Sequence, residues 1–187
     1  MGPLGRTLVS AGAGLALWAG APADGGTQEA TDAKTAYFAT VAQFFGVPSS
    51  EVAILAEWPL PAEEIPVVLF VARRAGVSPE ALVALRRAGR GWAELATRYQ
   101  VGPRQFHVPL APQADAGVLR EAYRRYRTLP PERWDEVSLS DRDIIVLVNV
   151  RVLAQTLHRA PEEILRAYED AGSFIELLRR LIGTEPE

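Results

Sequence analysis

Turn prolines and apolar residues occur in the same order in two stretches of this 187-residue chain. Trp92-Ala-Glu-Leu95 corresponds to Phe174-Ile-Glu-Leu177, and the same offset of 82 positions carries Pro79-Glu80-Ala-Leu82 onto Pro161-Glu162-Glu-Ile164. Few of these pairs are identities, so the correspondence rests on the order of residue types. Self-similarity at a fixed period indicates that one structural unit is used twice. This feature constrains the fold strongly, because both halves must then adopt the same order of elements.

The correspondence divides most of the chain into two units. We predict unit A over residues 35–110, a linker at 111–116, unit B over residues 117–183 and a tail at 184–187. The alternative is two unrelated helical halves of similar composition. With 48% hydrophobic residues, a chain of this length can bury one core or two small ones.

Residues typical of helix starts and helix ends occur in both units. Ser78-Pro79-Glu80 combines an N-cap, a proline at the first helical position and an acid in the first turn. Apolar residues within 32–45 recur at helical spacing, and Gly46 stands where that helix would end. About four helices fit into each unit, or about eight in all. We therefore predict an all-α fold in which a roughly four-helix unit occurs twice and packs as one helical domain.

β-branched residues make some segments ambiguous. Asp143–Val152 is so rich in Val and Ile that, taken alone, it favours a buried strand. Its partner in unit A, Glu63–Arg74, carries Pro66 where a first helical turn tolerates proline, and Ser140 begins an S-x-x-D capping pattern. We therefore predict that both segments are helices. Glu51–Trp58 stays open between a short strand and a helical turn.

Residues 1–23 have the order of a secretory signal peptide. Arg6 provides a positive charge, residues 7–20 are uncharged, and Ala21-Pro22-Ala23 has the small-residue pattern of a cleavage site. We predict cleavage after Ala23, a flexible leader at 24–34, and hence a secreted or periplasmic protein. The alternatives are an uncleaved anchor and a cytoplasmic protein with an Ala- and Gly-rich start.

Charge and composition argue against several classes of function. The net charge of −3 opposes general binding to nucleic acids or anionic membranes, which needs a surplus of Lys and Arg. Lys34 is the one lysine among 20 basic residues, a bias that we assign to a GC-rich genome rather than to function. Because the chain has no cysteine, it has no disulfide, thiolate metal site or thiol nucleophile.

Residues 79–106 resemble the first helices of helix-turn-helix regulators and recombinases. The shared pattern is L-R-x-x-G-x-x-W-x-E-L-A, after which those families have a turn and a recognition helix. The resemblance implies DNA binding, with Arg104 as the base-reading candidate. Here the turn is Val101-Gly102-Pro103, the recognition helix must end before Pro109, and unit B ends without a counterpart. We therefore predict an ordinary helical hairpin and keep the regulator as an alternative function.

The chain after residue 23 is also similar to uncharacterised exported bacterial proteins. The similarity rests on a V-S-P-E…L-R…G…W…L-A…F-x-V-P run, which lies here between Val77 and Pro109. It implies export and carries over no functional residue.

No catalytic, cofactor-binding or metal-binding residue is predicted. We expect neither of the two histidines, His107 and His158, to bind a metal. The acid pairs Glu63-Glu64 and Asp141/Asp143 resemble the paired carboxylates of glycoside hydrolases. Each pair begins a predicted helix, however, where acids stabilise the helix dipole, so we favour a structural role.

Five residues are candidates for contact with a partner. Arg120, Arg124 and Arg127 form a basic stripe at helical spacing, and Phe106 and His107 lie in a segment, 106–110, that Pro109 predicts to be extended. The stripe could meet an acidic partner or an anionic polymer. The alternative is an ordinary solvated face, because acidic residues lie close to the stripe in the sequence.

Some large or polar residues are expected inside the core. Trp58, Trp92 and Trp134 are expected to pack against other apolar residues. Asn149 lies in the middle of an apolar run and therefore needs a buried hydrogen-bond partner.

The sequence predicts an exported protein that acts by binding, as an interaction or structural module of the bacterial envelope. A helical repeat buries its inner stripes and offers an outer face to a partner, here another envelope protein or polymer. The alternatives are a helix-turn-helix regulator and an envelope hydrolase with unassigned carboxylates. We favour binding over catalysis and predict no cofactor.

Overall fold

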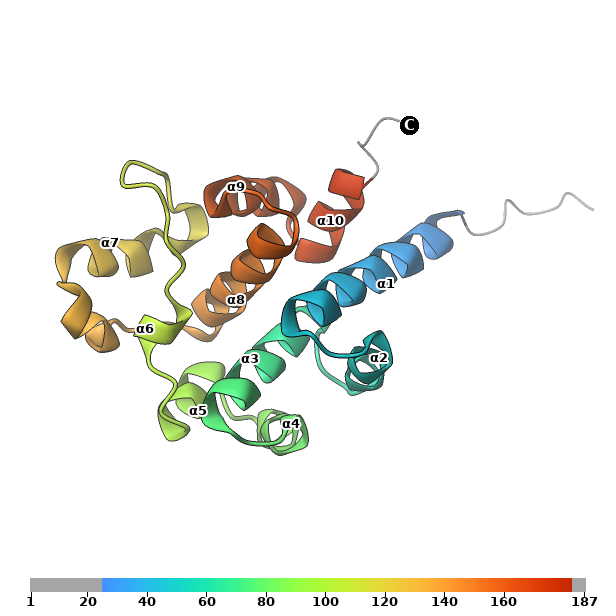
Figure 1. Cartoon of the computed structure of the whole chain (residues 1–187), viewed down its shortest axis with the longest axis horizontal. Coiled ribbons are helices and arrows are strands. Elements are labelled where there is room, and N and C mark those ends of the chain that lie inside the picture. Colours follow the sequence, from blue (N-terminus) through green and yellow to red (C-terminus); the bar gives the residue numbers. More distant parts are fainter. Residues whose placement is uncertain (1–24, 183–187) are drawn as a thin grey trace, which may run out of the picture.

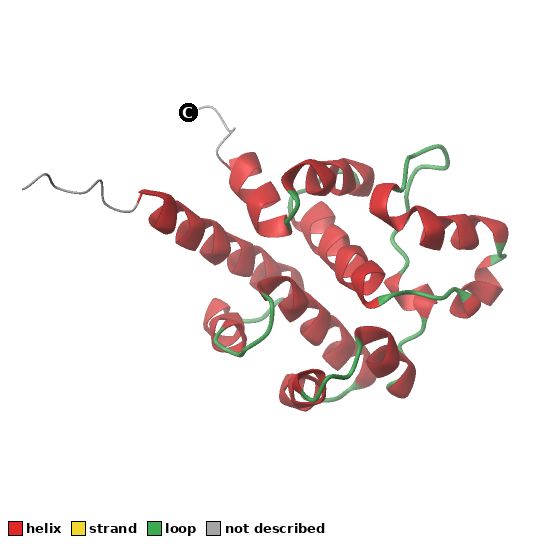
Figure 2. Cartoon of the chain, turned by 180° about the vertical axis from the view of Figure 1, so that it is seen from behind, coloured by secondary structure: helices red, strands yellow, loops and turns green. Residues whose placement is uncertain are grey.

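The computed structural model describes residues 25–182, which form ten α-helices and three 3-10 helices, without a strand among them (Figures 1 and 2). The helices pack as one domain, so the predicted all-α fold is confirmed. The α-helices are α1 (Gly25–Phe45), α2 (Ser49–Ala56), α3 (Ile65–Ala75), α4 (Pro79–Arg87), α5 (Trp92–Arg98), α6 (Pro103–Phe106), α7 (Arg120–Thr128), α8 (Asp141–Thr156), α9 (Pro161–Ala171) and α10 (Phe174–Ile182). The 3-10 helices are η1 (Ala62–Glu64), η2 (Gly117–Leu119) and η3 (Pro131–Glu136).

Helices α3 and α8 lie against each other at the centre of the fold (Figure 1). Every residue of α3 from Ile65 to Ala72 is buried, and so is most of α8 between Ile144 and Ala154. A helix that is buried on all sides carries apolar residues all round. This explains why Asp143–Val152 lacks a clear amphipathic pattern and resembles a buried strand in the sequence.

Local signals at the ends of α3 and α8 favour the helix. Ser140 and Asp143 form a reciprocal capping box at the start of α8. Pro66 lies in the first turn of α3, where its missing N–H costs no helical hydrogen bond, and Gly76 ends α3 at a φ of 67°. Both segments are therefore helices, as predicted.

The long helix α1 packs along α8 and α10 and also contacts α2 (Figure 1). The flexible leader expected at residues 24–34 is wrong for residues 25–34, which form the first half of α1. The buried stripe of this helix begins at Ala33 and continues through Tyr37 and Val41, and the turns before it line a hollow shared with α10. Residues 25–34 are therefore helical where α1 meets α10, although their small and polar side chains do not predict a helix. The predicted signal peptide at 1–23 lies outside the described residues.

The outer segments differ from prediction in detail. The open segment Glu51–Trp58 is helical as α2 up to Ala56. The expected extended backbone at 106–110 begins only at His107, because Phe106 is the last residue of α6 and the His107 amide donates to the Pro103 carbonyl at 3.2 Å. The described residues contain more helices than the eight expected, since α2, α6 and the 3-10 helices occupy connections.

All three predicted core tryptophans pack against the core, and Trp92 is fully buried.

Acidic side chains from each half of the chain cap a helix in the other half. The Phe174 amide at the start of α10 donates to Glu63 Oε1 at 2.6 Å, and Glu63 precedes α3. The Ala93 amide near the start of α5 donates to Asp141 Oδ1 at 3.0 Å, and Asp141 begins α8. Reciprocal contacts of this kind are what a duplicated unit would produce. The outer helices differ, because α1 contacts α8 and α10 whereas α7 lies mainly against η2, so the duplication stays a prediction.

Candidate functional site

A cavity of about 500 Å³ opens between α5, α6, η3 and the start of α8. Its apolar lining includes side chains that also belong to the core, and its polar lining comes from the ends of α5 and α6 and from η3. The apolar residues include Val101, Phe106, Val137, Leu139 and Ile144. The polar residues are Thr97, Gln100, Arg104, Gln105, Asp135 and Ser138. A concave site with an apolar lining and a few polar groups is the usual form of a ligand pocket.

Asp135 organises one edge of the cavity. Its Oδ1 accepts a hydrogen bond from the Arg104 amide at 3.2 Å, and its Oδ2 lies 3.6 Å from Arg104 Nε. A Cβ on Gly102 would lie 2.3 Å from Asp135 Oδ1, so a larger residue at this position would displace the Asp135 carboxylate. Gln100 has a left-handed backbone with a φ of 58°, and its carbonyl accepts from the Gln105 side chain at 3.2 Å. The polar edge is thus held by contacts between α5, α6 and η3.

Phe106 and His107, two of the five predicted contact residues, are not exposed beside the arginine stripe. Phe106 is buried and lines the inner part of the cavity. His107 is partly buried against aromatic rings, with its ring centroid 4.0 Å from that of Trp134 and 4.7 Å from that of Tyr126. Burial, together with the nearby Arg151 cation, lowers the pKa of His107 below its usual value. Neither side chain forms an exposed patch with the arginine stripe.

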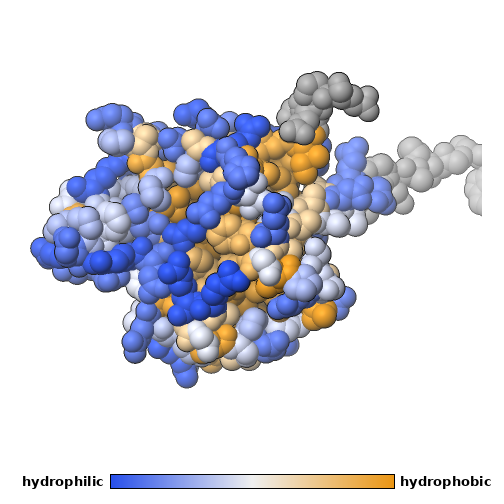
Figure 3. Space-filling view, viewed as in Figure 1, coloured by the Kyte–Doolittle hydropathy of each residue, from blue (hydrophilic) through white to orange (hydrophobic). Residues whose placement is uncertain are grey.

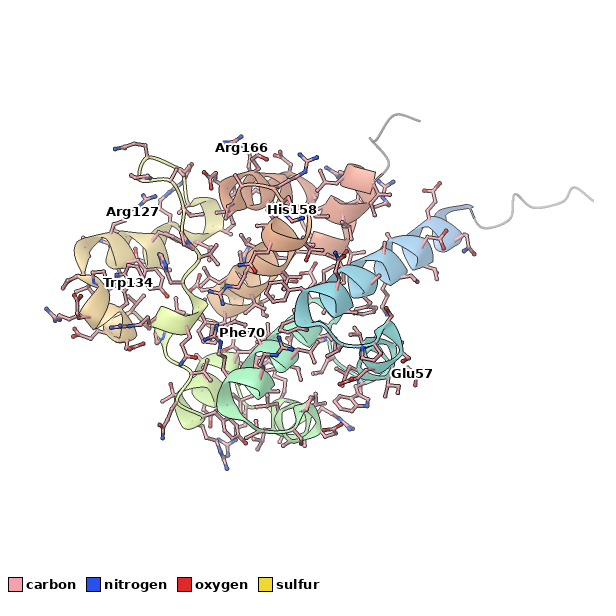
Figure 4. The ribbon with its side chains drawn as sticks, viewed as in Figure 1. Glu57, Phe70, Arg127, Trp134, His158 and Arg166 are labelled. Atoms are coloured by element: carbon pink, nitrogen blue, oxygen red, sulfur yellow. The ribbon has the colours of Figure 1, made fainter. Side chains whose placement is uncertain are left out.

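The stripe Arg120, Arg124 and Arg127 is exposed on α7, and Figure 4 labels Arg127. Each of these arginines has a partner within the chain. Arg120 lies 3.6 Å from Asp115, Arg124 lies 2.6 Å from Glu121, and Arg127 Nη2 donates to a backbone carbonyl at 2.8 Å. None of the three lines the cavity. The geometry therefore favours a solvated, internally compensated face for the stripe.

The predicted acid pairs serve packing rather than an open site. Glu64 is only 5% exposed and accepts both Arg86 Nε and Nη2 at 2.8 Å and Trp92 Nε1 at 3.0 Å. Arg86 Nη1 also donates to Asp141 Oδ2 at 3.0 Å. Burial is the main cause that raises the pKa of Glu63. The structural role is supported, but Glu63 and Asp141 cap helices other than the ones they begin.

The segment that resembles a helix-turn-helix forms α4, α5 and α6. Its third helix has only four residues, and Arg104, its one basic residue, faces Asp135. Recognition helices read the major groove with several side chains. The geometry of α6 therefore does not favour the DNA-binding alternative.

Two candidate functional features cannot be found from the sequence patterns. One is the cavity, whose lining joins residues near 100 with residues near 140. The other is a pair of arginines, Arg74 on α3 and Arg151 on α8, which both lie beside the Phe70 ring. In an Arg-rich sequence no spacing distinguishes these two from the others, so the sequence carries no signal for them.

Within residues 25–182 no group of three or more His, Cys, Asp and Glu side chains could hold a metal ion. Among the described helices none is both long enough and apolar enough to cross a bilayer. The sequence matches no protein-family model, no curated protein and no solved structure.

Proposed function

We propose that this chain is an exported binding protein of the bacterial envelope and that its ligand site is the cavity between α5, α6, η3 and α8. The cavity is the observation that carries the proposal. Its volume of about 500 Å³ lies within the range of roughly 300–1,000 Å³ typical of ligand pockets. Its polar edge provides donors and acceptors that can orient a ligand, and its apolar lining provides surface to bury.

The export half of the proposal rests on the signal-peptide pattern of residues 1–23. Cleavage after Ala23 would leave α1, which begins at Gly25, intact. N-terminal sequencing of the protein from fractionated cells tests this directly. We expect a mature N-terminus at Asp24 in the periplasmic or extracellular fraction. Intact Met1 in the cytoplasmic fraction would contradict export.

Filling the cavity tests the binding half. Ser138→Trp places a large ring at an exposed position of the cavity lining. Ser50→Trp makes the same change on α2, away from the cavity, and serves as the control. Both proteins are immobilised and exposed to envelope extract, and the retained material is compared by mass spectrometry. We expect a component that the control retains and Ser138→Trp loses, whereas equal retention by the two variants would rule out the cavity.

A further inference from the structure

Arg151 lies partly buried in the middle of α8 with incomplete hydrogen bonding. Its Nη2 donates to the His107 carbonyl at 2.7 Å, while its Nη1 is buried and has no partner among the described residues. A buried donor without a partner costs about 1–3 kcal/mol, and more when the group is charged. The guanidinium therefore has unused donors in a position where leaving them unused is unfavourable.

A second arginine increases the positive charge at this position. The guanidinium carbon of Arg74 lies 5.2 Å from the centroid of the Phe70 ring, and that of Arg151 lies 4.9 Å from the same centroid. Burial and the Arg74 cation lower the pKa of Arg151. No ion pair joins either arginine to a carboxylate in the part of the chain that the structure describes. Two like charges thus lie beside one aromatic ring without the counter-charge that would stabilise them.

Arg86 shows how the same fold treats a comparable arginine. It also lies beside an aromatic ring, at 5.4 Å from the centroid of Trp92. Glu64 binds it through two hydrogen bonds and Asp141 through a third, so its charge is compensated within the chain. The missing carboxylates at Arg74 and Arg151 are therefore a local feature, and they are the feature that an anionic ligand would supply.

Arg74 is the exposed member of the pair, whereas Arg151 is partly buried. Arg74 is exposed near the end of α3, and Phe70 is labelled in Figure 4 where α3, α6 and α8 converge. On this face, hydrophobic surface lies over α1, α3 and α8, and hydrophilic side chains border it on the side of α6 (Figure 3). The net charge of −3 provides no general attraction for anions, so binding here would depend on these two side chains.

We propose that Arg74 and Arg151 form a binding site for a phosphate group, either free phosphate or a phosphomonoester. Two uncompensated guanidinium groups match the charge of a dianion, and the planar guanidinium fork suits phosphate oxygens. Phosphate would supply acceptors for the exposed guanidinium of Arg74 and a negative counter-charge for Arg151. This site is separate from the cavity, whose lining contains neither arginine.

The test is calorimetric titration of the full chain with inorganic phosphate at pH 8 and constant ionic strength. We expect a Kd on the order of 1 mM, a usual strength for so small a ligand. Arg74→Gln should weaken binding about tenfold, because it removes one of the two charges without touching the core. Arg87→Gln is the matched control, since Arg87 is exposed at the end of α4 as Arg74 is near the end of α3. It should bind phosphate as the unmodified chain does.

Three results would overturn the site. The first is the absence of phosphate binding up to about 20 mM, which is far above the expected Kd. The second is equal phosphate affinity in Arg74→Gln and in the unmodified chain. The third is acetate binding as tight as phosphate binding. Arg151→Lys, checked for folding by circular dichroism, should also weaken binding, because lysine keeps the charge but lacks the fork.

A parallel assay with vesicles containing phosphatidic acid separates the two sources of phosphate. Binding to these vesicles that depends on Arg74 would identify a lipid headgroup, and binding to inorganic phosphate alone would identify a soluble ligand.

Discussion

At the scale of single residues, Asn149 shows how one polar side chain can be satisfied inside an apolar helix. It is fully buried, and its Oδ1 accepts a hydrogen bond from the Tyr37 hydroxyl of α1. Its Nδ2 donates to the Glu63 carbonyl at 2.9 Å and to the Ile145 carbonyl at 2.8 Å. The expectation that Asn149 has a buried partner is confirmed. These bonds join α8 to α1 and to the residues before α3.

Replacing Asn149 should therefore destabilise the fold more than its size suggests. Asn149→Leu leaves the Tyr37 hydroxyl and the Glu63 carbonyl buried without partners, and we expect a loss of about 3 kcal/mol in the free energy of unfolding. Tyr37→Phe alone should cost about 1–2 kcal/mol. Urea denaturation of the single and double variants gives the coupling. Strictly additive losses would show that the two side chains do not interact.

At the scale of elements, Arg86 connects four helical segments. It extends from α4 to Glu64 at the end of η1 and to Asp141 at the start of α8, and Glu64 also accepts from the Trp92 indole of α5. Residues 22 and 55 positions apart are thus joined around one guanidinium. A buried carboxylate that is fully hydrogen-bonded fixes the relative positions of the elements that contact it.

Glu64→Ala should remove most of this connection. It leaves the Arg86 cation with reduced compensation and the Trp92 N–H without an acceptor, so we expect a loss of about 3 kcal/mol. Glu132→Ala, at an exposed residue of η3, is the control and should change stability by less than about 0.5 kcal/mol. Thermal and urea unfolding of both variants measure the difference. Equal stabilities of the two variants would contradict a stabilising role for Glu64.

At the scale of the whole molecule, the two halves hold each other through helix caps and through the α3–α8 contact. The contribution of the Glu63 cap to the stability of the fold depends on pH, because the environment of Glu63 shifts its pKa. Burial raises its pKa above the usual 4.5, although hydrogen bonds from the Phe174 and Ile175 amides oppose the shift. An acid with a raised pKa in the folded state contributes stability that is complete below its unfolded pKa. That stability is lost as the pH rises through the folded pKa.

Glu63→Gln should remove this dependence. We expect the free energy of unfolding of the native chain, relative to the variant, to fall as the pH rises above the usual glutamate pKa of 4.5. Urea denaturation at several pH values measures both proteins. Glu51→Gln, at an exposed residue of α2, serves as the control and should follow the native chain. A native-to-variant difference that grows with pH would contradict the assigned direction of the pKa shift.

Much of the helical structure is predictable from short-range signals. The capping residues Ser78 and Ser140, the proline in the first turn of α3 and the glycine after it mark helix ends correctly. Such signals act within a few residues, because a cap satisfies the free amides of its own helix turn. The first half of α1 is missed because its small and polar residues carry no such signal, and its contact with α10 joins opposite ends of the described chain.

The candidate sites depend on packing in a way that no local pattern records. The sequence is sufficient for the all-α class, for most helix boundaries and for the buried partner of Asn149, since these follow from spacing and from the cost of an unpaired polar group. The sequence does not show, by contrast, which arginines have their charge compensated by a carboxylate. Arg86 forms ion pairs with Glu64 and Asp141, whereas Arg74 and Arg151 lie beside the Phe70 ring without a carboxylate partner among the described residues. Electrostatic energy depends on distance and burial, and both are set only when the helices pack.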